Sequence, residues 1–193
     1  MEEHQQPFRE RVPFDGQEVL VLAEAIRIAE ELISDHYKIS TSQWKRYRYD
    51  IQSLKDLLGE EITDLAFAQI RRYAFPPRDK ILASRHGDYF KICLQDHVIR
   101  RALARDAHLS LLPLATYIVT HELIHVVRFA RFLQRFEAPE REREAEEARV
   151  HRETIDLLQD LKIPGMEAVL SAFGACRFME TFVTDQADGQ VSH

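Results

Sequence analysis

The chain has 193 residues, of which 45% are hydrophobic and 30% charged, proportions that are ordinary for a globular protein with one domain and its own core. The formal net charge of -6 argues against nucleic acid or an anionic membrane as the main partner. Cys93 and Cys176 are the two cysteines and lack CxxC spacing, so we expect reduced thiols in a cytoplasmic protein, without a disulfide framework or a thiolate zinc site.

The N-terminal third of the sequence predicts helices. Asp15 is suited to cap a first helix with a regular apolar stripe. A second helical stretch is expected after Ser42 and through Leu58, where Gly59 follows and ends it. A third stretch, from about Glu60 to Tyr73, ends before two consecutive prolines. We therefore expect residues 16–73 to fold as a set of helices.

The pattern then changes from helical to β-prone. Residues 80–95 predict a short β-hairpin, because two β-prone runs flank the tetrapeptide Arg-His-Gly-Asp. Residues 97–105 predict a helix, and a long helix is expected over residues 113–136. The longest apolar segment, residues 109–127, falls mostly within that long helix. Its charged side chains make a membrane span expensive, so we expect a buried helix of a soluble protein.

Two further helices are expected in the C-terminal third. An Ala-Pro turn leads into a helix over residues 139–161 that begins with an acidic run and folds back antiparallel to the long helix. A last helix is expected over residues 166–182, and residues 186–193 form a polar, flexible tail. The sequence as a whole predicts a single α+β domain over residues 1–185 that is mostly helical.

The segment IVTHELIHVV, residues 118–127, places two histidines and a glutamate in an apolar run of the long helix. His121 and His125 are four residues apart, so both rings project from one helix face and are able to bind one Zn²⁺ at about 2.0–2.1 Å. Glu122 lies about 100° around the helix, where it is placed to take a proton from water at the metal. The segment therefore predicts a zinc site with Glu122 as general base.

This HExxH motif, with its uncharged flanks and the preceding hairpin, resembles the zincin metallopeptidases. It is most similar to gluzincins, in which a glutamate on a second helix completes the site, and the small size is similar to the minigluzincins. The resemblance covers about Asp79 to Leu161. It implies a zinc peptidase, and it implies that Tyr89 to Gln95 is an edge strand that pairs with extended substrate.

Catalytic zinc usually has three protein ligands and an open position, so a third ligand is needed from the following helix. That helix offers Glu144, Glu147 and His151, and gluzincin spacing is compatible with either glutamate. If the turn centres on the Ala-Pro dipeptide, His125 lies level with Arg152 and Glu147 lies about 7.5 Å short along the axis, which favours His151. We expect Glu147 as the third ligand, with His151 supporting the site or replacing Glu147, and Glu144 as the third choice.

The leading expectation is a zinc-dependent metallopeptidase that acts on a peptide or protein substrate, without a nucleic-acid or membrane partner. A second possibility is a di-iron carboxylate oxidoreductase, because Glu122 and His125 also form Glu-x-x-His and Glu147 with His151 would serve a second iron. A third is a non-catalytic metal-binding module that acts through its charged helix. The sequence assigns neither substrate-binding residues nor an oligomeric state.

Overall fold

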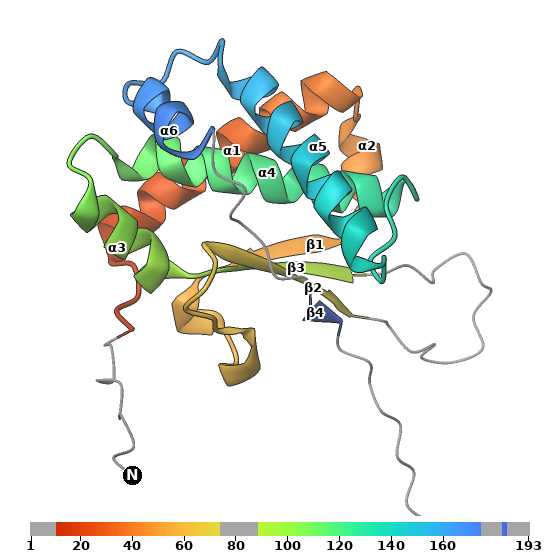
Figure 1. The fold of residues 1–193 in the computed structure, drawn as a ribbon, viewed down its shortest axis with the longest axis horizontal. Coiled ribbons are helices and arrows are strands. Elements are labelled where there is room, and N and C mark those ends of the chain that lie inside the picture. Colours follow the sequence, from red (N-terminus) through yellow and green to blue (C-terminus); the bar gives the residue numbers. More distant parts are fainter. Residues whose placement is uncertain (1–10, 74–88, 175–182, 185–193) are drawn as a thin grey trace, which may run out of the picture.

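The computed structural model describes residues 11–73, 89–174 and 183–184, and in Figure 1 its main helices lie together on one face of a small mixed sheet. The helices are α1 (Gly16–Tyr37), α2 (Thr41–Trp44), α3 (Asp96–Arg105), α4 (Leu111–Ala130), α5 (Glu140–Leu158) and α6 (Met166–Phe173), with 3-10 turns η1 (Leu54–Asp56) and η2 (Gly59–Glu61). The strands are β1 (Tyr49–Gln52), β2 (Ala68–Tyr73), β3 (Tyr89–Leu94) and β4 (Val183–Thr184). The expected α+β class, mostly helical, is confirmed.

The sheet has the strand order β1-β3-β2-β4. Strand β3 pairs antiparallel with β2 and parallel with β1, and β2 also pairs parallel with β4. Alternation along β3 sends Phe90, Ile92 and Leu94 into the hydrophobic core, where Phe90 stacks on Phe129 of α4 with ring centroids 5.5 Å apart. Helix α4 therefore packs on the apolar face of the sheet.

The expectation that Tyr89 to Gln95 forms an edge strand is wrong. Strand β3 lies between β1 and β2, so both of its sides are already paired within the chain. Its antiparallel partner is β2 and not the neighbouring segment of the expected hairpin 80–95, whose first strand lies outside the described residues. An extended substrate therefore has no open edge on this strand.

The expectation of helices throughout residues 16–73 is right for α1 and the short α2, and wrong for β1 and β2. The Asp15 side chain accepts hydrogen bonds from the backbone of Gln17 and Glu18 and so caps α1. The second helix ends at Trp44 and gives way to β1, and residues 68–73 form β2. Apolar residues between 60 and 73 recur at helical intervals, but pairing with β3 decides the conformation, and local spacing does not encode that pairing.

One outward N–H of the edge strand β1 is bonded to a side chain of the strand itself. The backbone N–H of Ile51 donates to Oδ1 of Asp50 over 2.9 Å, and Gln52 Nε2 donates to Oδ2 of the same carboxylate over 2.8 Å. Because the Phe90 N–H donates to the Arg48 carbonyl, alternate residues of β1 face β3 and Ile51 faces outward. The outward N–H therefore already has an acceptor.

The face of the sheet opposite the helices carries a buried charge cluster. The Glu61 carboxylate is fully buried and accepts two hydrogen bonds of 2.7 Å from Lys91 Nζ, with further bonds from the Tyr73 hydroxyl and the Leu58 backbone. Burial alone raises the pKa of Glu61, but these bonds outweigh it and hold the pKa below its usual value. The cluster ties the segment around η2 to β2 and β3.

Helix α4 is the central element of the helical layer. Every residue from Pro113 to Phe129 is buried, because α1, α5, α6 and the sheet surround it. This enclosure explains the long apolar segment that the sequence contains. Within the described residues, no helix has both the length and the apolar character needed to cross a membrane.

The later helices are shorter than the sequence predicts. Helix α4 ends at Ala130 and not at residue 136, while α3 and α5 agree with the expected helices 97–105 and 139–161 to within three residues. Helix α6 ends at Phe173, and residues 175–182 of the expected last helix lie outside the described part. The early end of α4 leaves a loop before α5, in which the chain turns back over α4 and crosses it obliquely (Figure 1).

We expect Lys91→Met to lower the free energy of unfolding by about 3–5 kcal/mol at neutral pH, because the buried Glu61 charge loses its main partner. Glu61 has a lowered pKa in the fold, so its contribution is present above the ordinary value of 4.5 and is lost as the pH falls through the folded pKa. The deficit of the variant should therefore shrink in acid, as measured by chemical denaturation.

The matched control is Lys55→Met, which removes an exposed lysine beside the same segment. We expect it to change stability by no more than about 0.5 kcal/mol. A deficit for Lys91→Met that is no larger than the control's, or that stays constant into acid, contradicts the stabilising role of the Lys91–Glu61 pair.

Candidate metal centre

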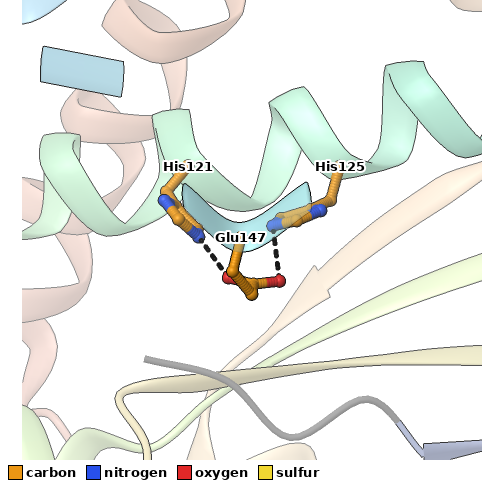
Figure 2. Close-up of side chains that lie close together, drawn as sticks. All are labelled: His121, His125 and Glu147. Atoms are coloured by element: carbon orange, nitrogen blue, oxygen red, sulfur yellow. Dashed lines mark ion pairs between the residues drawn. The ribbon is translucent and has the colours of Figure 1, made fainter. Parts of the chain in front are cut away.

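Two turns of α4 and the first half of α5 bring three side chains together. His121 and His125 project from the same face of α4, with ring centroids 5.0 Å apart, and the Glu147 carboxylate reaches between them from α5 (Figure 2). One nitrogen of each ring and a carboxylate oxygen of Glu147 all lie within 4.8 Å of one another. Both histidines are buried, and Glu147 is about a quarter exposed. The structure thus brings together the two predicted histidines and Glu147.

The separations between these atoms fit the edges of a metal coordination polyhedron. His125 Nε2 lies 3.3 Å from Glu147 Oε1, and His121 Nε2 lies 3.6 Å from Oε2. Ligand atoms bonded to one tetrahedral Zn²⁺ at about 2.0–2.2 Å lie roughly 3.3–3.6 Å apart. The two distances run to different oxygens of the same carboxylate, and the three side chains could hold one divalent ion between them.

The tautomer of His121 is fixed by a threonine on α5. Thr154 Oγ1 donates to the carbonyl of Val150 over 2.8 Å and lies 3.3 Å from Nδ1 of His121. Because a hydroxyl has one proton, Thr154 is the acceptor in its contact with the ring, and Nδ1 of His121 carries the hydrogen. The lone pair of the ring is therefore on Nε2, the nitrogen that faces Glu147.

His125 is oriented in the same way by a residue of the loop that follows α4. Its Nδ1 lies 3.0 Å from Oε1 of Gln134, and an amide oxygen accepts hydrogen bonds only. Nδ1 of His125 is therefore the donor, and Nε2 carries the lone pair. Two imidazole nitrogens and a carboxylate thus converge as electron-pair donors, an arrangement that a bound cation stabilises.

His151 lies outside the cluster. Its Nε2 donates to the Gly174 carbonyl over 3.1 Å, and its Nδ1 accepts from the Tyr117 hydroxyl over 2.9 Å. The ring links α4, α5 and the end of α6 and uses both nitrogens in doing so. Glu144, the third choice for a ligand, is exposed and is also absent from the cluster. Of the three candidates on α5, the structure brings Glu147 to the histidines.

Glu122 is buried on α4, one residue after the first histidine, and does not belong to the three-residue cluster. Burial, and then the Glu61 carboxylate, raise the pKa of the Cys93 thiol on β3 to about 12, and Glu122 adds to this effect. This position agrees with a residue that is near the cluster without being a metal ligand.

An ion pair next to the cluster holds α5 against α4. Arg128, which is buried one turn after His125, donates through Nε to the carboxylate of Glu146. Glu146 is the residue before Glu147. The Arg128–Glu146 ion pair therefore helps to fix the position of Glu147 along the axis of α4. The sequence gave no signal for this pair. Thr154 and Gln134 were also missed, because a threonine in a helix and a glutamine in a loop match no motif.

We expect the wild-type chain to hold one Zn²⁺ after zinc loading and gel filtration, and His121→Ala and Glu147→Ala to lose it, because each removes one of three ligands. His151→Ala should keep the metal, since its nitrogens bond to Tyr117 and Gly174. Glu144→Gln is the matched control for Glu147. Metal retention by Glu147→Ala together with loss by His151→Ala would contradict this ligand set.

Thr154→Val should weaken zinc binding by about 10–100-fold, because it removes the group that fixes the His121 tautomer. Thr154→Ser keeps the hydroxyl and should bind zinc as the wild type does. Competition with a chromogenic chelator measures both affinities. Equal affinities for the valine and serine variants would show that the hydroxyl does not orient the ring.

The cluster shares with the zincin pattern two histidines one turn apart and a glutamate from the following helix. It departs from the pattern in the position of β3, which lies inside the sheet. No family model, no curated protein and no solved structure matches this chain. A zincin-like centre therefore stays a prediction from the HExxH motif.

Proposed function

We propose that this protein is a zinc-dependent peptidase whose centre is His121, His125 and Glu147, with Glu122 as general base. The observation that carries the proposal is the convergence of the three metal-binding groups, with both imidazoles presented through Nε2. The separations of 3.3 Å and 3.6 Å support a single tetrahedral ion. Three protein ligands leave one position of such an ion for water or substrate, as catalytic zinc requires.

The chain's own residues would divide the chemistry between them. When bound, zinc supplies a Lewis acid that polarises a carbonyl and acidifies water. Glu122 would accept the proton of the attacking water and deliver it to the leaving amine. Its burial supports that role, because a carboxylate sheltered from bulk water interacts more strongly with a nearby charge. Thr154 and Gln134 would hold the two rings in the orientation that binding needs.

The di-iron alternative has less support. A second iron would need further ligands, and among the described residues the one group of three potential ligands is His121, His125 and Glu147. His151, which the alternative assigns to a second iron, bonds to Tyr117 and Gly174. Metal analysis separates the two proposals, because one zinc per chain is expected here and two irons are expected for the alternative.

Glu122→Gln is the test of the peptidase proposal. The variant should keep its zinc, because Glu122 is not a ligand, and should lose about 10²–10⁴-fold in the rate of peptide hydrolysis, because the proton acceptor is gone. Cleavage of a diverse peptide library by the zinc-loaded chain, followed by mass spectrometry, measures the rate.

Glu140→Gln, which removes an exposed carboxylate at the start of α5, is the control and should cleave as the wild type does. Two results count against the proposal in different ways. Undiminished hydrolysis by Glu122→Gln removes the role assigned to that residue. Tight zinc binding by a wild-type chain that cleaves no member of the library favours a non-catalytic metal-binding module.

A further inference from the structure

The end of the molecule that holds α2 also carries the loop after α4 (Figure 1). Arg131 joins the two segments: its Nε donates to the Tyr47 hydroxyl over 2.9 Å, and its Nη2 donates to the Tyr37 carbonyl over 3.0 Å. We call residues 38–48 and 131–136 together the basic end. It lies away from α3, which is at the opposite end of the helical layer (Figure 1).

The two segments of the basic end carry only positive charges, although the whole chain is acidic. Its two segments contain six Lys and Arg residues and no Asp or Glu, in a chain whose formal net charge is -6. Arg131 is used in the internal contacts above, and Arg135 pairs with Glu142 of α5. The other four cations are exposed, and none of them forms an ion pair within the described part of the chain: Lys38, Lys45, Arg46 and Arg48.

Two large apolar side chains of the basic end are exposed. Phe132 is 92% exposed and Leu133 is 56% exposed, the first of them among the highest values for a large apolar residue here. Both belong to the cap that ends α4: the Phe132 N–H donates to the Phe129 carbonyl and the Leu133 N–H to the Arg128 carbonyl. They are therefore presented by a rigid helix end and not by a loose loop.

Phe132 has an unusual backbone conformation in addition to its exposed side chain. Its φ is +56°, in the left-handed region where this kind of helix cap usually has glycine. Glycine or asparagine would end the helix with less strain and without exposing an aromatic ring to water. The chain thus retains a strained, exposed phenylalanine at a position that favours a smaller residue, which is typical of a side chain with a function outside the fold.

Exposed cations and an exposed apolar pair within one basic end match the chemistry of an anionic lipid surface. Lys and Arg side chains are attracted to negatively charged headgroups, while phenylalanine and leucine gain by entering the acyl boundary. Nucleic acid would use the cations but gains little from leucine. Trp44 and Tyr47, with ring centroids 5.8 Å apart, lie in the same segment and are the residue types enriched at membrane interfaces.

We propose that the basic end docks on the surface of an anionic membrane, with Phe132 and Leu133 inserted between headgroups and the four exposed cations in contact with phosphate or carboxylate groups. The net charge of the chain gave the opposite expectation, because it averages over an acidic remainder. Docking of this kind requires no membrane-spanning helix. It is also independent of whether the protein is a peptidase.

The test uses the full chain and sedimentable vesicles of phosphatidylcholine, with and without phosphatidylserine. We expect binding to the vesicles that contain phosphatidylserine, weaker binding at high salt, and a blue shift of the emission of Trp44, the single tryptophan. Phe132→Ser/Leu133→Ser and, separately, Lys45→Glu/Arg46→Glu should each reduce the partition by about tenfold or more.

Two controls match these variants. Leu65→Ser removes a leucine that is 89% exposed elsewhere, and Lys55→Glu/Arg105→Glu makes the same change in net charge at exposed positions outside the basic end. Both should bind as the wild type does. Since all substituted residues are exposed, far-ultraviolet circular dichroism should be unchanged in every variant.

Three results would overturn the proposal. The first is equal binding, or no binding, to the two kinds of vesicle. The second is wild-type partition by either basic-end variant, or an equal loss in its control. The third is a concentration-dependent dimer in the absence of vesicles that Phe132→Ser/Leu133→Ser abolishes, because the apolar pair would then be covered by a second copy of this chain.

Discussion

Helix α4 is enclosed by protein along almost its whole length, and this enclosure determines what each of its polar side chains can do. A polar group removed from water destabilises the fold unless it finds a hydrogen-bond partner. The partners come from α5, from the loop after α4 and from α4 itself: Thr116 with the Leu112 carbonyl, Tyr117 with His151, His121 with Thr154, His125 with Gln134 and Arg128 with Glu146. The candidate metal centre is one part of this larger set of buried contacts.

Helix α5 supplies most of those partners, and its polar residues fall into an exposed group and a group that faces α4. The acidic residues of its first turns lie in solvent, while Glu146, Glu147 and Thr154 face α4. The same helix therefore contributes the third ligand, the group that fixes the His121 ring and the partner of Arg128. A site whose orienting groups lie on packed helices keeps its geometry better than one built on loops. In this centre only Gln134 comes from a loop.

The metal-binding groups were predictable from the sequence because they depend on helix geometry, which is local. The i, i+4 spacing of His121 and His125 sets their common face whatever surrounds them. The choice between Glu147 and His151 as third ligand was harder to predict from the sequence, because it depends on where α4 ends. With α4 ending at Ala130 and α5 beginning at Glu140, the turn centres near Arg135, and His125 lies level with about residue 145. Glu147 is then about 3 Å away along the axis, which removes the argument for His151.

The strands were less predictable for the opposite reason. Residues 68–73 and 49–52 become strands through pairing with β3, which is up to about forty residues away in the sequence. In residues 68–73 the polar residues Gln69 and Arg71 are also buried, so the alternation of apolar and polar residues that marks a half-exposed strand is missing there. The residues that bond to His121, His125 and Arg128 are hard to predict for the same reason, since each is recognised only when two segments meet in the fold. They are Thr154, Gln134 and Glu146.

The carboxylate of Asp50 has an effect beyond its own strand. An unpaired strand at the margin of a sheet is a template on which other chains assemble into aggregates. On β1 the amide that an incoming chain would need is already bonded to Asp50, and the charge beside it repels acidic neighbours. One carboxyl group thus occupies a donor that an added strand would need, and it disfavours growth of the small sheet across molecules.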